Sequence, residues 1–279
     1  MKIIKKVKAP IRIDFGGGTT DIQPFPKKYG GAVLNAAINK YIAGEVVSSD
    51  KNVSLRYYGN IPTSSGLGTS SVMNLVWLSL ISKTKNKIEL AEKVYNLENS
   101  IGLVGGKQDP YVSALGGINF MEFKNDKVKV TRLNLKKELI KKLENSLILV
   151  YTGKPHFSGD ANKAIMDNFK KGKNEKNLLE IKKIAIEMKN ALLRGDLEKF
   201  AELMNRETDE RKKLHKSIVP PKIEKIIQRG MKHGAIGAKV CGAGGGGSIL
   251  FFGDKKKLKK EFKQKVIDFK FDFKGLRWL

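Results

Sequence analysis

The sequence predicts an α+β fold divided into two domains, and three observations lead to this prediction. The length of 279 residues is that of about two domains. In the first half, strand and helix patterns follow one another without the regular βαβα order of a doubly wound sheet. After Thr152, helical periodicity with many charged residues dominates. We therefore predict domains at residues 1–155 and 156–279, and the 41% of hydrophobic residues is enough to give each a core.

The first half of the chain is predicted to begin with a half-buried strand. Apolar and charged residues alternate from 2 to 14, and Gly16–Gly18 end this pattern. Next come β-branched and aromatic runs typical of strands, a loop containing Pro62, and good helix formers from Ser70 onward. The elements predicted after the first strand are strands at 42–47 and 53–58, helices from 70 and at 89–99, and strands at 118–123, 128–133 and 147–151.

The second half is predicted to be mainly helical until a late glycine run. Apolar residues recur there at helical spacing between charged residues, and the strands near the end are separated by Gly242–Gly247. The predicted elements are helices at 161–170, 176–193, 196–206 and 222–233, strands at 238–241 and 248–252, a basic helix, and a last strand at 267–273.

Charge and cysteine content narrow the class of protein. The formal net charge of +26 attracts anions, such as nucleic acid, an acidic membrane surface or a phosphorylated small molecule. The lysines are spread along the chain, so charge alone selects none of these. The single cysteine excludes a disulfide scaffold and a cysteine-based zinc site. No apolar run reaches the roughly 20 residues of a membrane span, and the start lacks the apolar core of a signal peptide. We expect a cytoplasmic protein with no membrane partner.

A loop rich in glycine and hydroxyl residues precedes the helix predicted from Ser70. Such a loop presents backbone N–H groups and the positive end of the helix dipole, which together form an anion site. It can also be an ordinary Ser/Thr N-cap, and it matches neither the Walker A pattern nor G-x-G-x-x-G. The residues predicted to bind phosphate are Pro62, Ser64, Ser65, Gly66, Leu67, Gly68, Thr69, Ser70 and Ser71.

Two further glycine segments lie near the two ends of the chain. In the first, a glycine bend joins Arg12 to Thr19, Thr20 and Asp21, whose polar groups suit a polyol; the alternative is an Asx-type turn. The second, Gly242–Gly247, has more glycine than a hairpin needs. It predicts close approach of the backbone to a ligand or another loop, beside a Cys241 that we expect to be a buried apolar residue.

Two carboxylates flank the glycine-rich turn at 102–106. Phosphoryl transfer requires Mg²⁺ with oxygen ligands and a group that accepts or orients the proton of the acceptor hydroxyl. Glu98 and Asp109 can supply these two functions, with Arg12 stabilising charge, although each carboxylate taken alone reads as a surface charge. None of the three histidines has a zinc-ligand spacing; His156, after a predicted strand, is a weaker candidate for facing a substrate.

The three glycine segments, in this order, resemble the three signature motifs of the GHMP kinases. The matching stretches are Ala9–Asp21, Pro62–Ser71 and Lys239–Ser248, which together extend over nearly the whole chain. The resemblance implies a ribosomal-S5-domain-2-like N-terminal domain, a ferredoxin-like C-terminal domain, and ATP with Mg²⁺ in the cleft. It also implies that the loop at 62–71 binds the nucleotide.

The resemblance also assigns roles to individual residues. It makes Asp109 the catalytic carboxylate and Arg12 the charge-stabilising residue, and it makes Ser70 and Glu98 the Mg²⁺ ligands. The residues placed beside the acceptor are Asp14, Gly17, Gly18, Thr19, Thr20, Asp21, Gly106, Gln108, Gly244 and Gly245.

Within the superfamily, the sequence is similar to the heptose-7-phosphate kinases and related sugar-1-kinases. This predicts that a monomer or homodimer transfers phosphate to a hydroxyl, the anomeric one, of a sugar or sugar phosphate. The sequence departs from the group at His156-Phe157-Ser158, where we expect Arg-x-Ser. Two alternatives remain: a mevalonate- or isoprenoid-pathway kinase of the same superfamily, and a basic nucleic-acid-binding protein on an S5-like domain, whose affinity falls steeply with salt. We expect no nucleic-acid partner.

Overall fold

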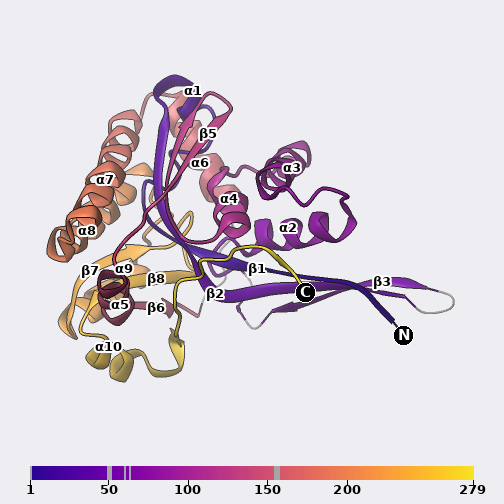
Figure 1. Cartoon of the computed structure of the whole chain (residues 1–279). Helices are drawn as coiled ribbons and strands as arrows, with labels where there is room; N and C mark the ends of the chain where they lie inside the picture. The colour runs from indigo at the N-terminus through magenta and orange to yellow at the C-terminus, as the bar shows by residue number, and fades with distance from the viewer. Residues whose placement is uncertain (1, 49–51, 60, 63, 154–157) are drawn as a thin grey trace.

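The computed structural model describes residues 2–48, 52–59, 61–62, 64–153 and 158–279. Its strands form two antiparallel sheets with helices packed beside them (Figure 1). This arrangement confirms the predicted α+β class. None of the helices in these ranges is long and apolar enough to cross a membrane.

The first sheet carries the N-terminal part of the site. Its strands are β1 (Lys2–Gly16), β2 (Gly31–Ser48), β3 (Val53–Gly59), β4 (Ile118–Lys124), β5 (Lys127–Arg132) and β10 (Arg277–Trp278). Their order is β10-β1-β2-β4-β5, and β3 pairs with β2 where the two strands project from the body (Figure 1). Side chains alternate between the faces of a strand, so Arg12 and Asp14 share one face of β1 while Ile11 and Ile13 share the other. All four are buried.

Four helices pack on or beside the first sheet. These are α2 (Thr69–Ile81), α3 (Lys87–Ser100), α4 (Gln108–Leu115) and the short α1 (Phe25–Tyr29). Helix α2 contacts β1 and β2 through Val72, Leu75 and Val76, which lie on one helical face and are fully buried. Helix α3 begins at an N-cap, Asn86, whose side chain accepts from two backbone amides. The packing brings the starts of α2 and α4 to the same end of β1.

The second sheet has the topology of a ferredoxin-like unit. Its strands are β6 (Leu147–Tyr151), β7 (Ala235–Val240), β8 (Ser248–Gly253) and β9 (Val266–Ile267), in the order β7-β8-β6-β9. Strands and helices follow one another as β-α-β-β-α-β, as the resemblance implies, with several helices in the first crossover. The helices of this half are α5 (Lys137–Ser146), α6 (Ser158–Lys170), α7 (Glu175–Arg194), α8 (Leu197–Leu214), α9 (Pro221–Lys232), α10 (Lys255–Phe262) and the 3₁₀ turn η1 (Lys263–Lys265).

The two sheets share one hydrophobic core. Phe15 of β1 packs edge-on against Phe200 of α8, with ring centroids 5.3 Å apart, and Phe200 packs against Phe252 of β8 at 6.1 Å. Strand β6 precedes residue 155 but lies in the second sheet, and β10, at the C-terminus, lies in the first. The division into 1–155 and 156–279 therefore stays a prediction.

The predicted strand at 267–273 is wrong over most of its length. Only Val266–Ile267 pair in the second sheet, and Phe271 forms a single bridge with Ile38 of the first. Phe269 and Phe271 are both buried. The alternating apolar pattern therefore indicates that this segment buries these two side chains as it passes between the sheets, and it does not indicate a strand. Helices α1, α4 and α5 and the first half of β2 were not predicted.

Candidate active site

A cavity of about 420 Å³ lies where the three glycine segments meet. Its wall includes residues from the end of β1, the start of α2, the start of α4 and the loop after β7. The residues of the predicted site that line it are Arg12, Asp14, Gly18, Thr19, Asp21, Ser64, Gly66, Gly68, Thr69, Ser70, Ser71, Glu98, Gly106, Gln108 and Asp109. Segments that are more than 200 residues apart in sequence thus form one pocket.

Arg12 and Asp109 form a two-pronged ion pair at the centre of this cavity. Arg12 Nε donates to Asp109 Oδ1 over 2.7 Å and Nη2 donates to Oδ2 over 2.8 Å, a fork-to-fork geometry. The third nitrogen of Arg12 donates to the carbonyl of Gly66 over 2.6 Å. Burial alone would lower the pKa of Arg12, but Asp109 and Asp14 raise it above its ordinary value. Arg12 is therefore a permanent cation that fixes the Asp109 carboxylate beside the loop that precedes α2.

The loop before α2 has the geometry of an anion site. Gly68 precedes the helix in the left-handed conformation, with φ of 75°, and no side chain among the described residues caps it. The first turn of a helix presents backbone N–H groups without intrahelical partners, and the hydroxyl residues Thr69 and Ser70 line the cavity there. The Asp109 carboxylate also lies close to this loop: a Cβ built on Gly68 would be 3.2 Å from Asp109 Oδ2.

The glycine run after β7 packs directly on this loop. A Cβ on Gly66 would lie 2.7 Å from the carbonyl oxygen of Cys241, and a Cβ on Gly242 would lie 2.8 Å from that of Gly66. The two backbones can approach this closely because both positions are glycine. The close approach predicted for Gly242–Gly247 is therefore confirmed, with another loop as the neighbour, and Cys241 is fully buried as expected.

Glu98 of α3 lies at the edge of the cavity with neutral partners. Its carboxylate accepts from Ser71 Oγ and from Asn74 Nδ2, each over 3.0 Å. Burial raises the pKa of Glu98, and the charge of Asp109 raises it further. Ser70 lies on the cavity wall, but the serine that contacts Glu98 is Ser71.

Asp21 provides a buried carboxylate in the wall of the cavity. Its side chain is 2% exposed and accepts from the backbone amide of Gln108 over 3.0 Å and from Gln108 Nε2 over 3.3 Å. Gly106 allows this contact, since a Cβ there would be 1.9 Å from Asp21 Oδ2. Burial raises the pKa of Asp21 to about 6, and the nearby Asp109 contributes to the rise.

Several predicted residues lie behind the cavity wall rather than on it. The Thr20 hydroxyl is engaged by the carbonyl of Gly17 over 2.7 Å and by the backbone of Ala32. Gly245 donates its amide to the carbonyl of Ile218 over 2.7 Å. The structure does not bring these residues to the cavity: Gly17, Thr20, Pro62, Ser65, Leu67, Gly244 and Gly245. His156, a weaker candidate, lies outside the described residues.

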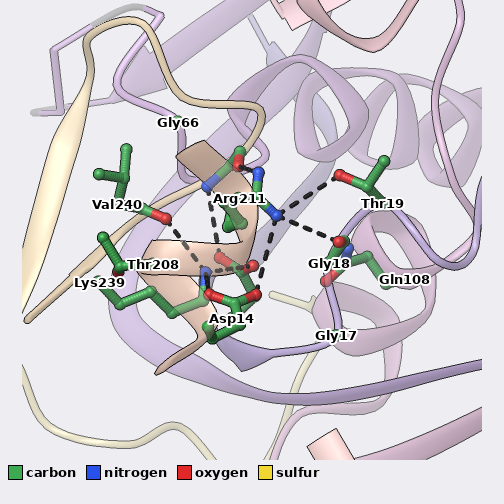
Figure 2. Close-up of polar contacts among 12 residues, drawn as sticks. Asp14, Gly17, Gly18, Thr19, Gly66, Gln108, Thr208, Arg211, Lys239 and Val240 are labelled. Atoms are coloured by element: carbon green, nitrogen blue, oxygen red, sulfur yellow. Dashed lines mark hydrogen bonds and ion pairs between the residues drawn. The ribbon is translucent and has the colours of Figure 1, made fainter. Parts of the chain in front are cut away.

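Next to the predicted Asp14 lie three buried charged residues for which the sequence predicted no role, Lys239, Glu207 and Arg211. Lys239 Nζ lies 2.8 Å from Asp14 Oδ2 (Figure 2). It also lies 3.4 Å from Glu207, and Arg211 lies 3.8 Å from Glu207. Burial alone would raise the pKa of Asp14, but Lys239, Arg12 and Arg211 hold it well below its usual value. Asp14 is thus a structural anion at the edge of the cavity.

Two family models and several known proteins match this chain. A family model described as GHMP kinases N terminal domain matches residues 31–117, and one described as GHMP kinases C terminal matches residues 188–271. The chain is 31% identical to the D-glycero-alpha-D-manno-heptose 7-phosphate kinase of Campylobacter jejuni over 99% of both chains. It is 28% identical to glucuronokinase 1 of Arabidopsis thaliana over 67% of this chain and 55% of that protein. A crystal structure of a D-glycero-D-manno-heptose 1-phosphate kinase from Bacteroides thetaiotaomicron superposes with a TM-score of 0.77 and 25% identity over 99% of both chains.

Proposed function

This chain belongs to the GHMP kinase family and is a sugar kinase, and we propose that it transfers the γ-phosphoryl group of ATP to the anomeric hydroxyl of a sugar or sugar phosphate. The observation that supports this proposal best is the Arg12–Asp109 pair. It lies in one cavity between the start of α2 on one side and Asp21 on the other. Direct transfer of a phosphoryl group from a nucleotide to a polyol requires three features in one pocket. These are a phosphate site, a fixed carboxylate and a wall that binds hydroxyl groups.

The nucleotide side of the pocket is proposed to be the loop before α2. Kinases of this family use ATP as the phosphate donor. The uncapped first turn of α2 offers backbone N–H donors to phosphate oxygens, and Thr69 and Ser70 offer hydroxyls. Since Gly66 contacts Gly242, the run at 242–247 supports this loop from behind.

Glu98 and Ser70 fit the ligand set of a Mg²⁺ ion. Glu98 is buried with two neutral partners and its pKa is raised, so a cation beside it would compensate its charge. The described residues contain no group of three His, Cys, Asp or Glu that could hold a metal by itself. This agrees with Mg²⁺, which binds one or two carboxylates together with waters and substrate phosphates. When bound, the ion neutralises charge on the phosphates.

Glu98→Gln is expected to raise the Mg²⁺ concentration for half-maximal activity by roughly tenfold or more. The amide keeps the shape of the side chain but loses the charge that attracts the ion. The measurement is a Mg²⁺ titration of initial rate at saturating ATP and acceptor. The matched control is Glu89→Gln. Glu89 is an exposed residue of the same helix, and its carboxylate pairs with Lys93. An unchanged Mg²⁺ requirement in Glu98→Gln would remove Glu98 from the ligand set.

On the acceptor side, this chain's residues orient a hydroxyl and receive its proton. The reacting hydroxyl lies against Asp109, which accepts its proton as the oxygen attacks phosphorus. Arg12 keeps Asp109 in place and stabilises negative charge as it develops. Asp21, with Thr19 and Gln108 beside it, accepts hydrogen bonds from the other hydroxyls of the sugar.

A panel of acceptors in a coupled ADP-release assay tests this proposal. The panel contains hexoses, heptoses, their phosphates and mevalonate, each with ATP and Mg²⁺. We expect turnover with a hydroxyl-rich acceptor and none with mevalonate, because Asp21 would face an apolar part of that molecule. Turnover with mevalonate alone, or with no member of the panel, would overturn the proposed acceptor class.

The acceptor kcat/KM is expected to rise with pH through about 6, the pKa of Asp21, because only the ionised carboxylate accepts from two hydroxyls. Asp21→Asn should abolish this rise.

Folding stability should change with pH in the opposite direction. Because the folded-state pKa of Asp21 is raised, its contribution to the free energy of unfolding is present below about pH 4 and is lost as pH rises through about 6. The measurements are pH profiles of kcat/KM and of the urea midpoint. A step near pH 6 that persists in Asp21→Asn would assign it to another group.

A further inference from the structure

Asp14, which lines the cavity, and three charged side chains behind it are almost completely excluded from water. Asp14 is 1% exposed, and Glu207, Arg211 and Lys239 are each 0% exposed. They carry two positive and two negative charges, so the group is neutral when all four are ionised. A buried group of this type is weak grounds for stability, since hydrophobic residues of the same volume often serve as well. Its contacts indicate what else it does.

Arg211 contacts two of the three glycine segments at once. One terminal nitrogen of its guanidinium donates to the carbonyl of Gly18 over 3.1 Å and lies 3.5 Å from Thr19 Oγ1. The other donates to the carbonyl of Gly242. The planar fork of arginine suits two acceptors held at a fixed separation. Arg211 therefore fixes the turn at 17–19, which follows β1, relative to the loop that follows β7.

The turn that Arg211 contacts contains a strained residue. Thr19 has φ of 82°, a left-handed conformation that is an outlier for a β-branched residue. It is 4% exposed and lines the cavity next to Asp21. Strain of this kind persists where the surroundings determine the conformation, and it is typical of ligand-binding sites.

We propose that Arg211 is a positioning residue that holds Thr19 in its left-handed conformation at the acceptor wall of the cavity. Asp14 and Lys239 keep the turn and Arg211 in register, because Lys239 contacts both Asp14 and Glu207 and Glu207 neighbours Arg211 at 3.8 Å. The effect on catalysis rests on the proposed function, since Arg211 acts on acceptor binding through Thr19.

The first experiment separates the two substrates. Glu207→Gln combined with Arg211→Met removes one buried charge of each sign, and kinetics are measured with the acceptor found in the panel. We expect KM for the acceptor to rise roughly tenfold, because the variant loses hydrogen bonds from a charged donor. KM for ATP should stay at the wild-type value. Arg206→Met, which removes an arginine of the same helix that pairs with Glu180 and Glu187, should change neither constant.

The second experiment measures the coupling of Arg211 to Thr19 without any substrate. Glycine adopts positive φ without strain, so Thr19→Gly should raise the urea midpoint of the wild type, in which Arg211 holds the strained turn. The rise should be smaller in the Glu207→Gln, Arg211→Met background, because Thr19 can relax there. If that double variant does not fold, Arg211→Lys, which keeps the charge but cannot bridge both carbonyls, takes its place in both experiments.

The outcomes distinguish this proposal from the proposed function. Equal effects of Thr19→Gly in the two backgrounds, or acceptor and ATP KM values that rise together, would overturn the role of Arg211. A wild-type protein that phosphorylates no sugar would overturn the proposed function, and the urea measurements would then still decide whether Arg211 holds Thr19.

Discussion

Asp109→Asn is expected to lower kcat by roughly 10³-fold while ATP binding survives. The amide has the shape of the carboxylate and still accepts one hydrogen bond from Arg12, but it cannot take the proton of the acceptor hydroxyl. The nucleotide contacts proposed for the start of α2 do not involve this proton. Single-turnover kinetics measure the chemical step, and calorimetry with ATP and Mg²⁺ measures binding.

The matched control for this variant is Asp268→Asn. Asp268 is an exposed carboxylate that pairs with Lys259 on the surface, and its neutralisation changes the net charge by the same amount. It should leave kcat unchanged. If Asp109→Asn retains near wild-type turnover, Asp109 is not the group that receives the proton, and the role assigned to its pair with Arg12 fails with it.

Arg12→Met is expected to lower kcat by roughly 10²-fold or more and to lower the free energy of unfolding by about 3 kcal/mol. The variant removes three hydrogen bonds, two to Asp109 and one to the carbonyl of Gly66. It leaves the half-buried Asp109 carboxylate without its counter-ion. Rate measurements and urea unfolding test the two effects separately.

Arg12→Lys is the informative comparison for this prediction. Lysine keeps the positive charge but lacks the planar fork that binds both carboxylate oxygens. We expect a stability close to wild type and a kcat between those of the wild type and Arg12→Met. A lysine variant with wild-type kcat would show that charge alone, and not the position of Asp109, is what catalysis needs.

The parts of the site that could be predicted from sequence have local signatures. Glycine clusters next to hydroxyl or charged residues stand out because glycine is unfavourable in regular elements. They led to Arg12, Asp21 and the loop before α2, and the spacing around the next glycine turn led to Glu98 and Asp109. The structure brings all of these to one cavity.

The parts that could not be predicted depend on tertiary contacts. Glu207 and Arg211 are four residues apart on a helix, a spacing typical of exposed ion pairs, and only the fold places them against Asp14 and Lys239. Helix α4 has eight residues and follows a glycine turn, so its pattern is too short to separate from a loop. Apolar and polar residues alternate around Phe269 and Phe271 as they do in a strand, because the two aromatic rings are buried. The segment nevertheless forms few backbone hydrogen bonds to either sheet.

The most direct test of the central claim is ³¹P NMR of the product formed from ATP, Mg²⁺ and the acceptor found in the panel. We predict a new phosphate monoester signal that is coupled to the anomeric proton of the sugar and grows as ATP is converted to ADP. With Asp109→Asn the signal should grow roughly 10³-fold more slowly. ADP formed together with inorganic phosphate and no sugar ester, or a phosphate ester formed on mevalonate alone, would contradict the claim that this pocket joins a nucleotide to a sugar.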